Sequence, residues 1–120
     1  MSDVNNKNGS PPAEKNMQHI CINFHSAIEF IGKRWMGAVI HSLLQGPKRY
    51  NEIVSSIPGI SDRLLTERLR ELEIEGLIVK RIIATSPKKV EYELTHEGKK
   101  LDEVIHVLME WVKNRNQNGV

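Results

Sequence analysis

The chain has 120 residues, 39% hydrophobic and 27% charged, a balance that fits one small globular domain and excludes a disordered chain. Its single cysteine excludes an intramolecular disulfide, and no apolar run approaches the roughly 20 residues that a membrane span needs. We therefore expect a cytoplasmic protein with no membrane partner. Since it has only 2 Trp, 2 Tyr and 2 Phe, its core should be mostly aliphatic.

The net charge is only +2, but the basic residues are segregated along the chain. Segments 33–50 and 79–90 each carry four Lys or Arg residues and no acid, whereas acids gather at 67–75 and from 97 onwards. A chain of this kind can present one strongly positive face. The pattern indicates a polyanionic partner.

The first half of the chain shows helical periodicity. Residues 1–16 are polar and are predicted to form a disordered arm. Apolar residues at three- and four-residue spacings predict an amphipathic helix that ends near Gly32, and a second helix over 35–44 that the Gly-Pro pair at 46–47 stops. A third, short helix is expected over 50–56.

A fourth helix follows a Pro-Gly turn at 58–59. Ser61 is a natural N-cap for this helix, and Gly76 is placed to end it. Its buried stripe is expected to comprise Leu64, Leu65, Leu69 and Leu72.

The last third of the chain predicts a hairpin and a final helix. Runs 77–83 and 90–94 have strand character and flank a turn at 85–88. Thr95 is predicted to cap the final helix, and 114–120 to form a flexible tail. A short helix, a turn, a longer helix and a hairpin in this order predict an α+β winged helix-turn-helix domain over 17–113.

The fourth helix has the composition of a recognition helix. With its leucines inward, its opposite face carries Arg63, Thr66, Glu67 and Arg70. Arg63 and Arg70 can pair with guanine, Thr66 can touch a thymine methyl group, and Ser61 can contact phosphate. These five residues are predicted to bind double-stranded DNA.

Other basic residues are predicted to contact the DNA backbone. Lys88 and Lys89 lie at the hairpin tip, with Lys80 and Arg81 at its base, where they can reach phosphates or a minor groove. Lys48 and Arg49 form a matching clamp before the third helix. The alternative is that the tip lysines only prevent strand-to-strand pairing.

Two further alternatives concern the polar face and the fold as a whole. The recognition face can instead be a solvated surface stabilised by spaced ion pairs. Arg68, nearer its edge, is expected to pair with Glu71, Glu75 or Glu52. A generic α+β domain that binds something else would have the same topology.

A homodimer is expected because one recognition helix and one hairpin rarely give a specific complex. The final helix also has more apolar residues than its share of the core requires. The predicted interface comprises Ile20, Phe24, Ile105, Leu108, Met109 and Val112. The operator should then be pseudo-palindromic, with half-sites about one helical turn apart. The alternative is that these residues cover the monomer's own core.

Several motifs in order resemble the HxlR family of winged-helix transcriptional regulators, relatives of the MarR group. They are Ile31-Gly32-Lys33-Arg34-Trp35, the run 46–53, Gly59-Ile60-Ser61, the run 65–73, Gly76-Leu77-Ile78, Pro87 with 90–95, and Gly98. The resemblance covers about 21–111. It implies a homodimer whose first and last helices form the dimer contact and whose operator binding most simply represses transcription.

Cys21 lies eleven residues before Gly32. In thiol-based members of the family, a Cys at this place senses quinones, diamide-like oxidants or reactive aldehydes. A helix N-terminus and nearby cations, His19, His25 and Lys15, favour the reactive thiolate. We expect oxidation to release DNA through an intersubunit disulfide, a mixed disulfide with a low-molecular-weight thiol, or an electrophile adduct. The alternative is an inert, buried thiol.

Other classes of function have weaker signals. His19, Cys21 and His25 are possible ligands of a metal sensor, but a structural site needs a fourth ligand. No nucleophile with its base and no phosphate-binding loop is present, so we expect neither an enzyme nor a cofactor. A winged-helix module that binds only proteins is the remaining alternative.

Overall fold

The computed structural model describes residues 23–117. The chain forms two compact units, residues 1–33 and 34–120. In the first unit a helix over 23–31 ends where the Gly32 N–H donates to the Ile28 carbonyl at 2.8 Å, which confirms the predicted helix end. None of the helices within 23–117 has both the length and the apolar character needed to cross a membrane.

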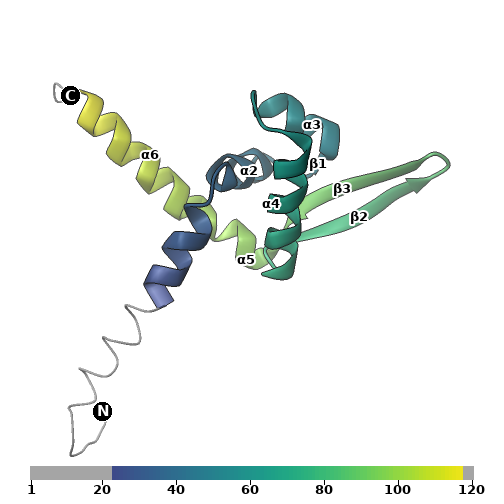
Figure 1. The fold of residues 1–120 in the computed structure, drawn as a ribbon, viewed down its shortest axis with the longest axis horizontal. Coiled ribbons are helices and arrows are strands. Elements are labelled where there is room, and N and C mark those ends of the chain that lie inside the picture. The colour runs from purple at the N-terminus through teal and green to yellow at the C-terminus, as the bar shows by residue number, and fades with distance from the viewer. Residues whose placement is uncertain (1–22, 118–120) are drawn as a thin grey trace, which may run out of the picture. The chain divides into compact units, whose positions relative to one another are not determined.

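The second unit contains the remaining elements (Figure 1). They are α2 (Met36–Leu44), β1 (Lys48–Arg49), α3 (Tyr50–Ser56), α4 (Asp62–Ile74), β2 (Ile78–Thr85), β3 (Lys88–Leu94), α5 (His96–Lys99) and α6 (Leu101–Gln117). Helices α3 and α4 form the helix-turn-helix, and the hairpin β2–β3 is its wing. The predicted α+β winged helix-turn-helix fold is therefore confirmed.

The three strands form one antiparallel sheet in the order β1-β3-β2. β1 pairs Lys48 with Tyr92 and Arg49 with Glu91, an element that the sequence analysis did not predict. Two residues are too short for any periodicity, so this strand had no sequence signal. The hairpin projects beyond the helices (Figure 1) and ends at a turn around 86–87, as predicted.

Local chemistry fixes both ends of α4. The Ser61 hydroxyl oxygen accepts from the Leu64 N–H at 3.1 Å, which confirms the predicted N-cap. Gly76 has a φ of 75°, and the Leu77 N–H donates to the Leu72 carbonyl at 2.9 Å. This pattern is a Schellman motif, which requires a residue that tolerates the left-handed region.

The core is aliphatic, as predicted. Leu65, Leu69 and Leu72 of α4 are at most 3% exposed, whereas Leu64 is only half-buried. The other buried apolar residues of the core are Met36, Val39, Ile40, Leu43, Ile53, Ile57, Ile60, Ile78, Leu94 and Ile105. The buried side of α4 therefore fixes which of its side chains meet solvent.

The predicted final helix is two helices, α5 and α6, separated at Lys100. The Lys100 N–H donates to the carbonyl of Glu97, three residues back, so the backbone turns more tightly there. α6 continues to Gln117, past residue 113, where the sequence analysis ended the domain. Its polar last turn needs no core contact to continue the helical hydrogen bonds.

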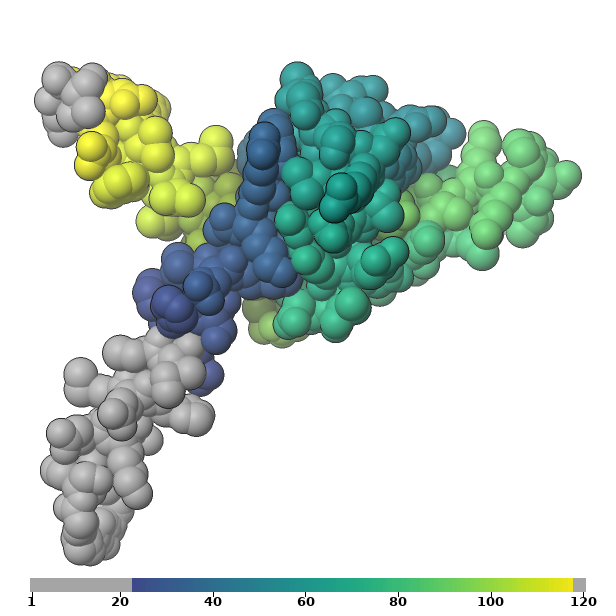
Figure 2. Space-filling model, in the orientation of Figure 1, coloured from purple at the N-terminus to yellow at the C-terminus, as the bar shows by residue number. Residues whose placement is uncertain are grey.

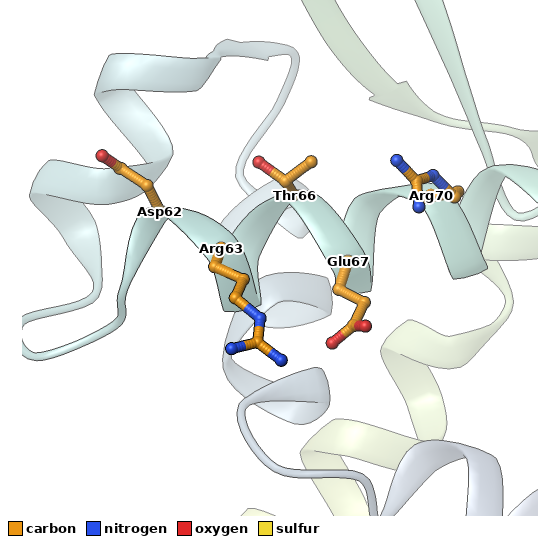
Figure 3. Close-up of a pocket in the computed structure, with 5 residues that line it drawn as sticks. All are labelled: Asp62, Arg63, Thr66, Glu67 and Arg70. Atoms are coloured by element: carbon orange, nitrogen blue, oxygen red, sulfur yellow. The ribbon is translucent and has the colours of Figure 1, made fainter.

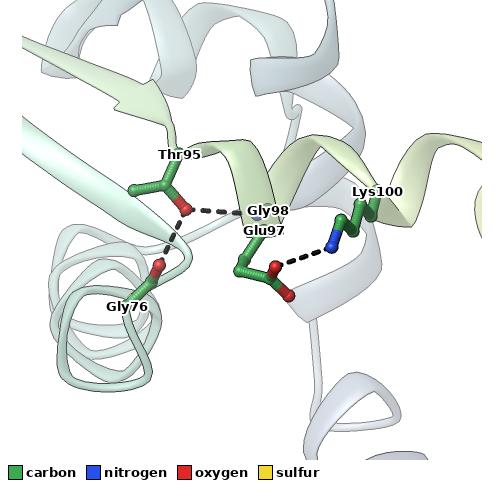
Figure 4. Close-up of polar contacts among 5 residues, drawn as sticks. All are labelled: Gly76, Thr95, Glu97, Gly98 and Lys100. Atoms are coloured by element: carbon green, nitrogen blue, oxygen red, sulfur yellow. Dashed lines mark hydrogen bonds and ion pairs between the residues drawn. The ribbon is translucent and has the colours of Figure 1, made fainter.

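A clasp around Thr95 joins α5 to the corner between α4 and β2 (Figure 4). The Thr95 hydroxyl donates to the Gly76 carbonyl at 2.7 Å and accepts from the Gly98 N–H at 3.1 Å. The Thr95 N–H donates to the Leu77 carbonyl at 2.9 Å. A Cβ atom on Gly98 would lie 2.1 Å from the same Leu77 oxygen, so the clasp requires glycine there.

We expect Gly98→Ala to lower the free energy of unfolding by about 1–3 kcal/mol, because backbone must move to admit the methyl group. Denaturant unfolding measures the effect. Gly37→Ala is the matched control, since nothing lies within 4 Å of a Cβ built there and alanine favours the helix. A Gly98→Ala protein as stable as wild type would contradict the role of the clasp.

Candidate nucleic-acid interface

The exposed side of α4 carries the predicted recognition residues (Figure 3). Arg63, Thr66, Glu67 and Arg70, together with Asp62, line a shallow hollow of about 350 Å³. Arg63 and Glu67 extend to one side of the helix, and Asp62 and Thr66 lie on the adjacent side. All five are exposed, and Arg63, Glu67 and Arg70 lie on the side of the helix away from the buried leucines. The helix thus offers donors, an acceptor and a methyl group along one surface.

Arg63 and Arg70 are the cations of this surface. Neither forms a hydrogen bond or an ion pair with another residue in the part of the chain described. This favours an interface over the alternative of a face stabilised by its own ion pairs. Both guanidinium groups keep their donors for a ligand.

Arg68, in contrast, is bonded within the fold and stabilises it. Its side chain is only 11% exposed, its Nε donates to the Arg34 carbonyl at 3.0 Å, and it pairs with the Glu71 carboxylate. Glu71 is one of the three partners expected for Arg68. The Arg34 carbonyl directly precedes Trp35, the N-cap of α2, whose φ is 70°, so the bond from Arg68 holds the backbone at the start of α2.

Tyr50 is a residue that the sequence analysis did not assign to the site. Its hydroxyl donates to the Asp62 carbonyl at 2.9 Å and lies 3.3 Å from an Asp62 carboxylate oxygen and 3.2 Å from the Thr66 hydroxyl. Tyr50 thereby joins α3 to the first turns of α4. Contacts over 12 and 16 residues leave no local sequence signal.

The residues predicted to clamp phosphate lie at the starts of α3 and α4. Lys48 donates from Nζ to the Gln45 side chain at 2.8 Å. The Arg49 N–H donates to the Glu52 carboxylate at 2.7 Å, and its guanidinium Nε lies 4.0 Å from the same oxygen. The Ser61 hydroxyl accepts a capping bond, so its hydrogen remains available for donation.

The sheet separates the predicted phosphate contacts into two sets, because successive strand side chains point to opposite faces. Tyr92 pairs with Lys48 of β1 and with Lys80 of β2, so these three share a face. The Lys80 ammonium lies 5.9 Å from the centre of the Tyr92 ring. Lys88 follows on the same face by alternation along β3. This face of the three strands carries three lysines and no acid.

The opposite face is mixed in charge. Arg49, Glu91 and Arg81 lie in one row across the strands. The Arg81 Nε is 2.7 Å from the Glu93 carboxylate, so this arginine is already paired. Lys89 falls on this face, whereas Lys88 falls on the other. The two tip lysines therefore extend to opposite sides of the wing, which is exposed at its tip over residues 85–89 (Figure 2).

The apolar residues predicted for a dimer interface are mostly uncovered. Ile105 is 7% exposed and belongs to the core, but Leu108, Met109 and Val112 of α6 are 52%, 51% and 45% exposed. Phe24 of the first unit is 65% exposed. Ile20 lies outside the described residues. The three α6 residues are thus about half exposed in the structure of residues 23–117.

The remaining predicted residues concern thiol and metal chemistry. His19 and Cys21 lie outside the described residues. Within residues 23–117 no three His, Cys, Asp or Glu side chains are grouped to hold a metal ion. His25 lies 3.5 Å from Glu29. On α6, the pKa of His106 is raised. The largest cause is the hydrogen bond between its Nδ1 and the Asp102 carbonyl, and the second is the charge of the Asp102 carboxylate.

A model of the HxlR-like helix-turn-helix family matches residues 30–119, most of the chain. The chain belongs to this family. The transcriptional regulator YodB of Bacillus subtilis is 41% identical over 92 residues, covering 77% of this chain and 82% of YodB. YvaP, a second HTH-type regulator of the same organism, is 36% identical over 96 residues, covering 80% and 89%. This HxlR-family member is a DNA-binding transcriptional regulator and not an enzyme.

Solved structures of relatives have the same fold. Reduced YodB superposes with a TM-score of 0.73 at 39% identity, over 82% of this chain and 96% of YodB. The redox regulator HypR in its oxidised form gives 0.71 at 34% identity, over 77% of this chain and 95% of HypR. YodB has also been solved after diamide treatment and with bound quinone.

Proposed function

We propose that this chain is a homodimeric repressor of a pseudo-palindromic operator. Helix α4 contacts the operator bases, and the wing contacts the DNA phosphate backbone. The observation that carries the proposal is the surface of α4, where Arg63 and Arg70 are exposed and unpaired within the described residues. Each arginine can donate two hydrogen bonds to guanine. Thr66 can contact a thymine methyl group, and Glu67 can accept from a cytosine amino group.

The phosphate contacts come from both sides of α4. The starts of α3 and α4 carry Lys48, Arg49 and Ser61, and one face of the sheet carries Lys80 and Lys88. Lys89 reaches from the other face of the wing tip. Since phosphate contacts release counterions from the duplex, they make affinity depend steeply on salt.

The homodimer would cover the exposed apolar face of α6. Leu108, Met109 and Val112 line a hollow of about 640 Å³ on this helix, a size that side chains of a partner helix can fill. Two copies would bring two recognition helices to two half-sites. Phe24 and Ile20 would complete the interface.

Cys21 would make operator binding responsive to oxidants. The support is similarity to YodB, solved reduced, diamide-treated and quinone-bound, and to the redox regulator HypR. An intersubunit disulfide, a mixed disulfide or an electrophile adduct at Cys21 would shift the first helix. A small change in the spacing of two recognition helices would then weaken binding to both half-sites.

Genomic DNA capture with the reduced protein, followed by titration of the recovered duplex, tests the DNA-binding surface. We expect Arg70→Ala to lower the free energy of operator binding by about 1–3 kcal/mol. Lys88→Ala should reduce the slope of log affinity against log salt concentration by about one. Lys100→Ala removes the same charge far along the chain, from a side chain paired with Glu97, and should leave the slope nearly unchanged. Capture of random DNA alone would contradict the proposal.

Sedimentation of two matched variants tests the dimer. Leu108→Glu places a charge on the proposed interface, so we expect a monomer, because an unpaired buried charge is costly. Val107→Glu places the same charge on the other side of α6, where Val107 is 64% exposed, and should remain a dimer. Equal masses for the two variants would argue against this interface.

The redox role is tested by operator affinity before and after diamide. Wild-type protein should lose affinity on oxidation, and Cys21→Ser should bind equally well in both conditions, because only the thiolate reacts. Intact mass distinguishes a disulfide from a mixed disulfide or an adduct. If oxidised wild type, reduced wild type and Cys21→Ser all bind alike, Cys21 is not a sensor.

A further inference from the structure

The hydrogen-bond group formed by Tyr50, Asp62 and Thr66 lies at the start of the recognition surface. Tyr50 has one phenol hydrogen, and Asp62 offers it only acceptors, a backbone carbonyl at 2.9 Å and a carboxylate oxygen at 3.3 Å. The phenol hydrogen therefore goes to Asp62. The 3.2 Å contact between Tyr50 and Thr66 then requires the Thr66 hydroxyl to be the donor.

This assignment determines what Thr66 can offer to a ligand. Its side chain is exposed on α4 between Asp62 and Arg70 (Figure 3), but its only hydroxyl hydrogen is directed to Tyr50. What remains is the methyl group and an acceptor lone pair. In the major groove, guanine presents only acceptors, N7 and O6, whereas thymine presents a methyl group.

We propose that Tyr50 is a positioning residue that sets the base preference of Thr66. By holding the Thr66 hydroxyl hydrogen, Tyr50 withholds the donor that guanine would need at that place and leaves the Thr66 methyl group to read a thymine. The inference rests on the proposed operator binding by α4. It adds a residue of α3, which does not itself touch the base, to the determinants of sequence specificity.

The experiment uses the full chain and a duplex that wild-type protein selects from a random-sequence pool. Each thymine is replaced in turn by deoxyuridine, which lacks only the methyl group. One thymine in each half-site should then show an affinity loss of about fourfold, the value of one buried methyl group. The same penalty should persist in Thr66→Val, which keeps a methyl group there, and disappear in Thr66→Ser, which does not.

Tyr50→Phe tests the positioning role. It releases the Thr66 hydroxyl, which can then donate to guanine, so the penalty for guanine at the methyl-sensitive position should fall relative to wild type. Thermal unfolding of each variant shows whether it is folded. If Tyr50→Phe does not fold, Thr66→Val decides the matter: it removes a hydroxyl hydrogen that Tyr50 already holds, so the penalty for guanine should stay as in wild type, and a larger penalty would overturn the positioning role.

The outcomes separate this inference from the proposed function. Recovery of no preferred duplex would contradict operator binding itself. A preferred, salt-dependent duplex with no methyl-sensitive thymine would overturn only the role of Thr66. Loss of the methyl penalty in Thr66→Val would likewise overturn the role of Thr66. A folded Tyr50→Phe that rejects guanine as strongly as wild type would overturn the positioning role of Tyr50.

Discussion

Burial of the leucine stripe on α4 is the constraint on which the rest of the site depends. Leu65, Leu69 and Leu72 are spaced so that only one rotation of the helix removes all three from water. That burial contributes roughly 1.5–3 kcal/mol for each side chain. A different rotation would expose them, so the choice of Arg63 and Arg70 for the solvent side is made by the core.

Hydrogen bonds from polar side chains then define the position of α4 more narrowly than apolar packing can. Arg68 bonds a backbone carbonyl before α2, and Tyr50 bonds the first turn of α4 from α3. At the far end, the clasp around Thr95 fixes the corner that follows α4. Because hydrogen bonds have strict geometry, these contacts convert a buried helix into a surface with defined donor positions.

The parts of the fold that depend on local chemistry could be predicted from the sequence. The Ser61 cap, the Gly76 terminus and the hairpin turn each follow from a few neighbouring residues, and the structure confirms them. What the sequence could not reveal depends on residues far apart along the chain. β1 exists only because Tyr92 and Glu91 pair with it, and Tyr50 gains its role from Thr66, sixteen residues away.

The near-neutral net charge of +2 is compatible with a polyanionic ligand because the structure sorts its cations. Arg68 and Arg81 are neutralised by Glu71 and Glu93, so they stabilise the fold and add little to the external field. Arg63 and Arg70 lack such partners among the residues described, as do the tip lysines. Acids therefore lower the total charge while two arginines on α4 and two lysines at the wing tip stay without an acidic partner among the residues described. The surface that meets a ligand is set by which cations are paired, and the composition alone does not report it.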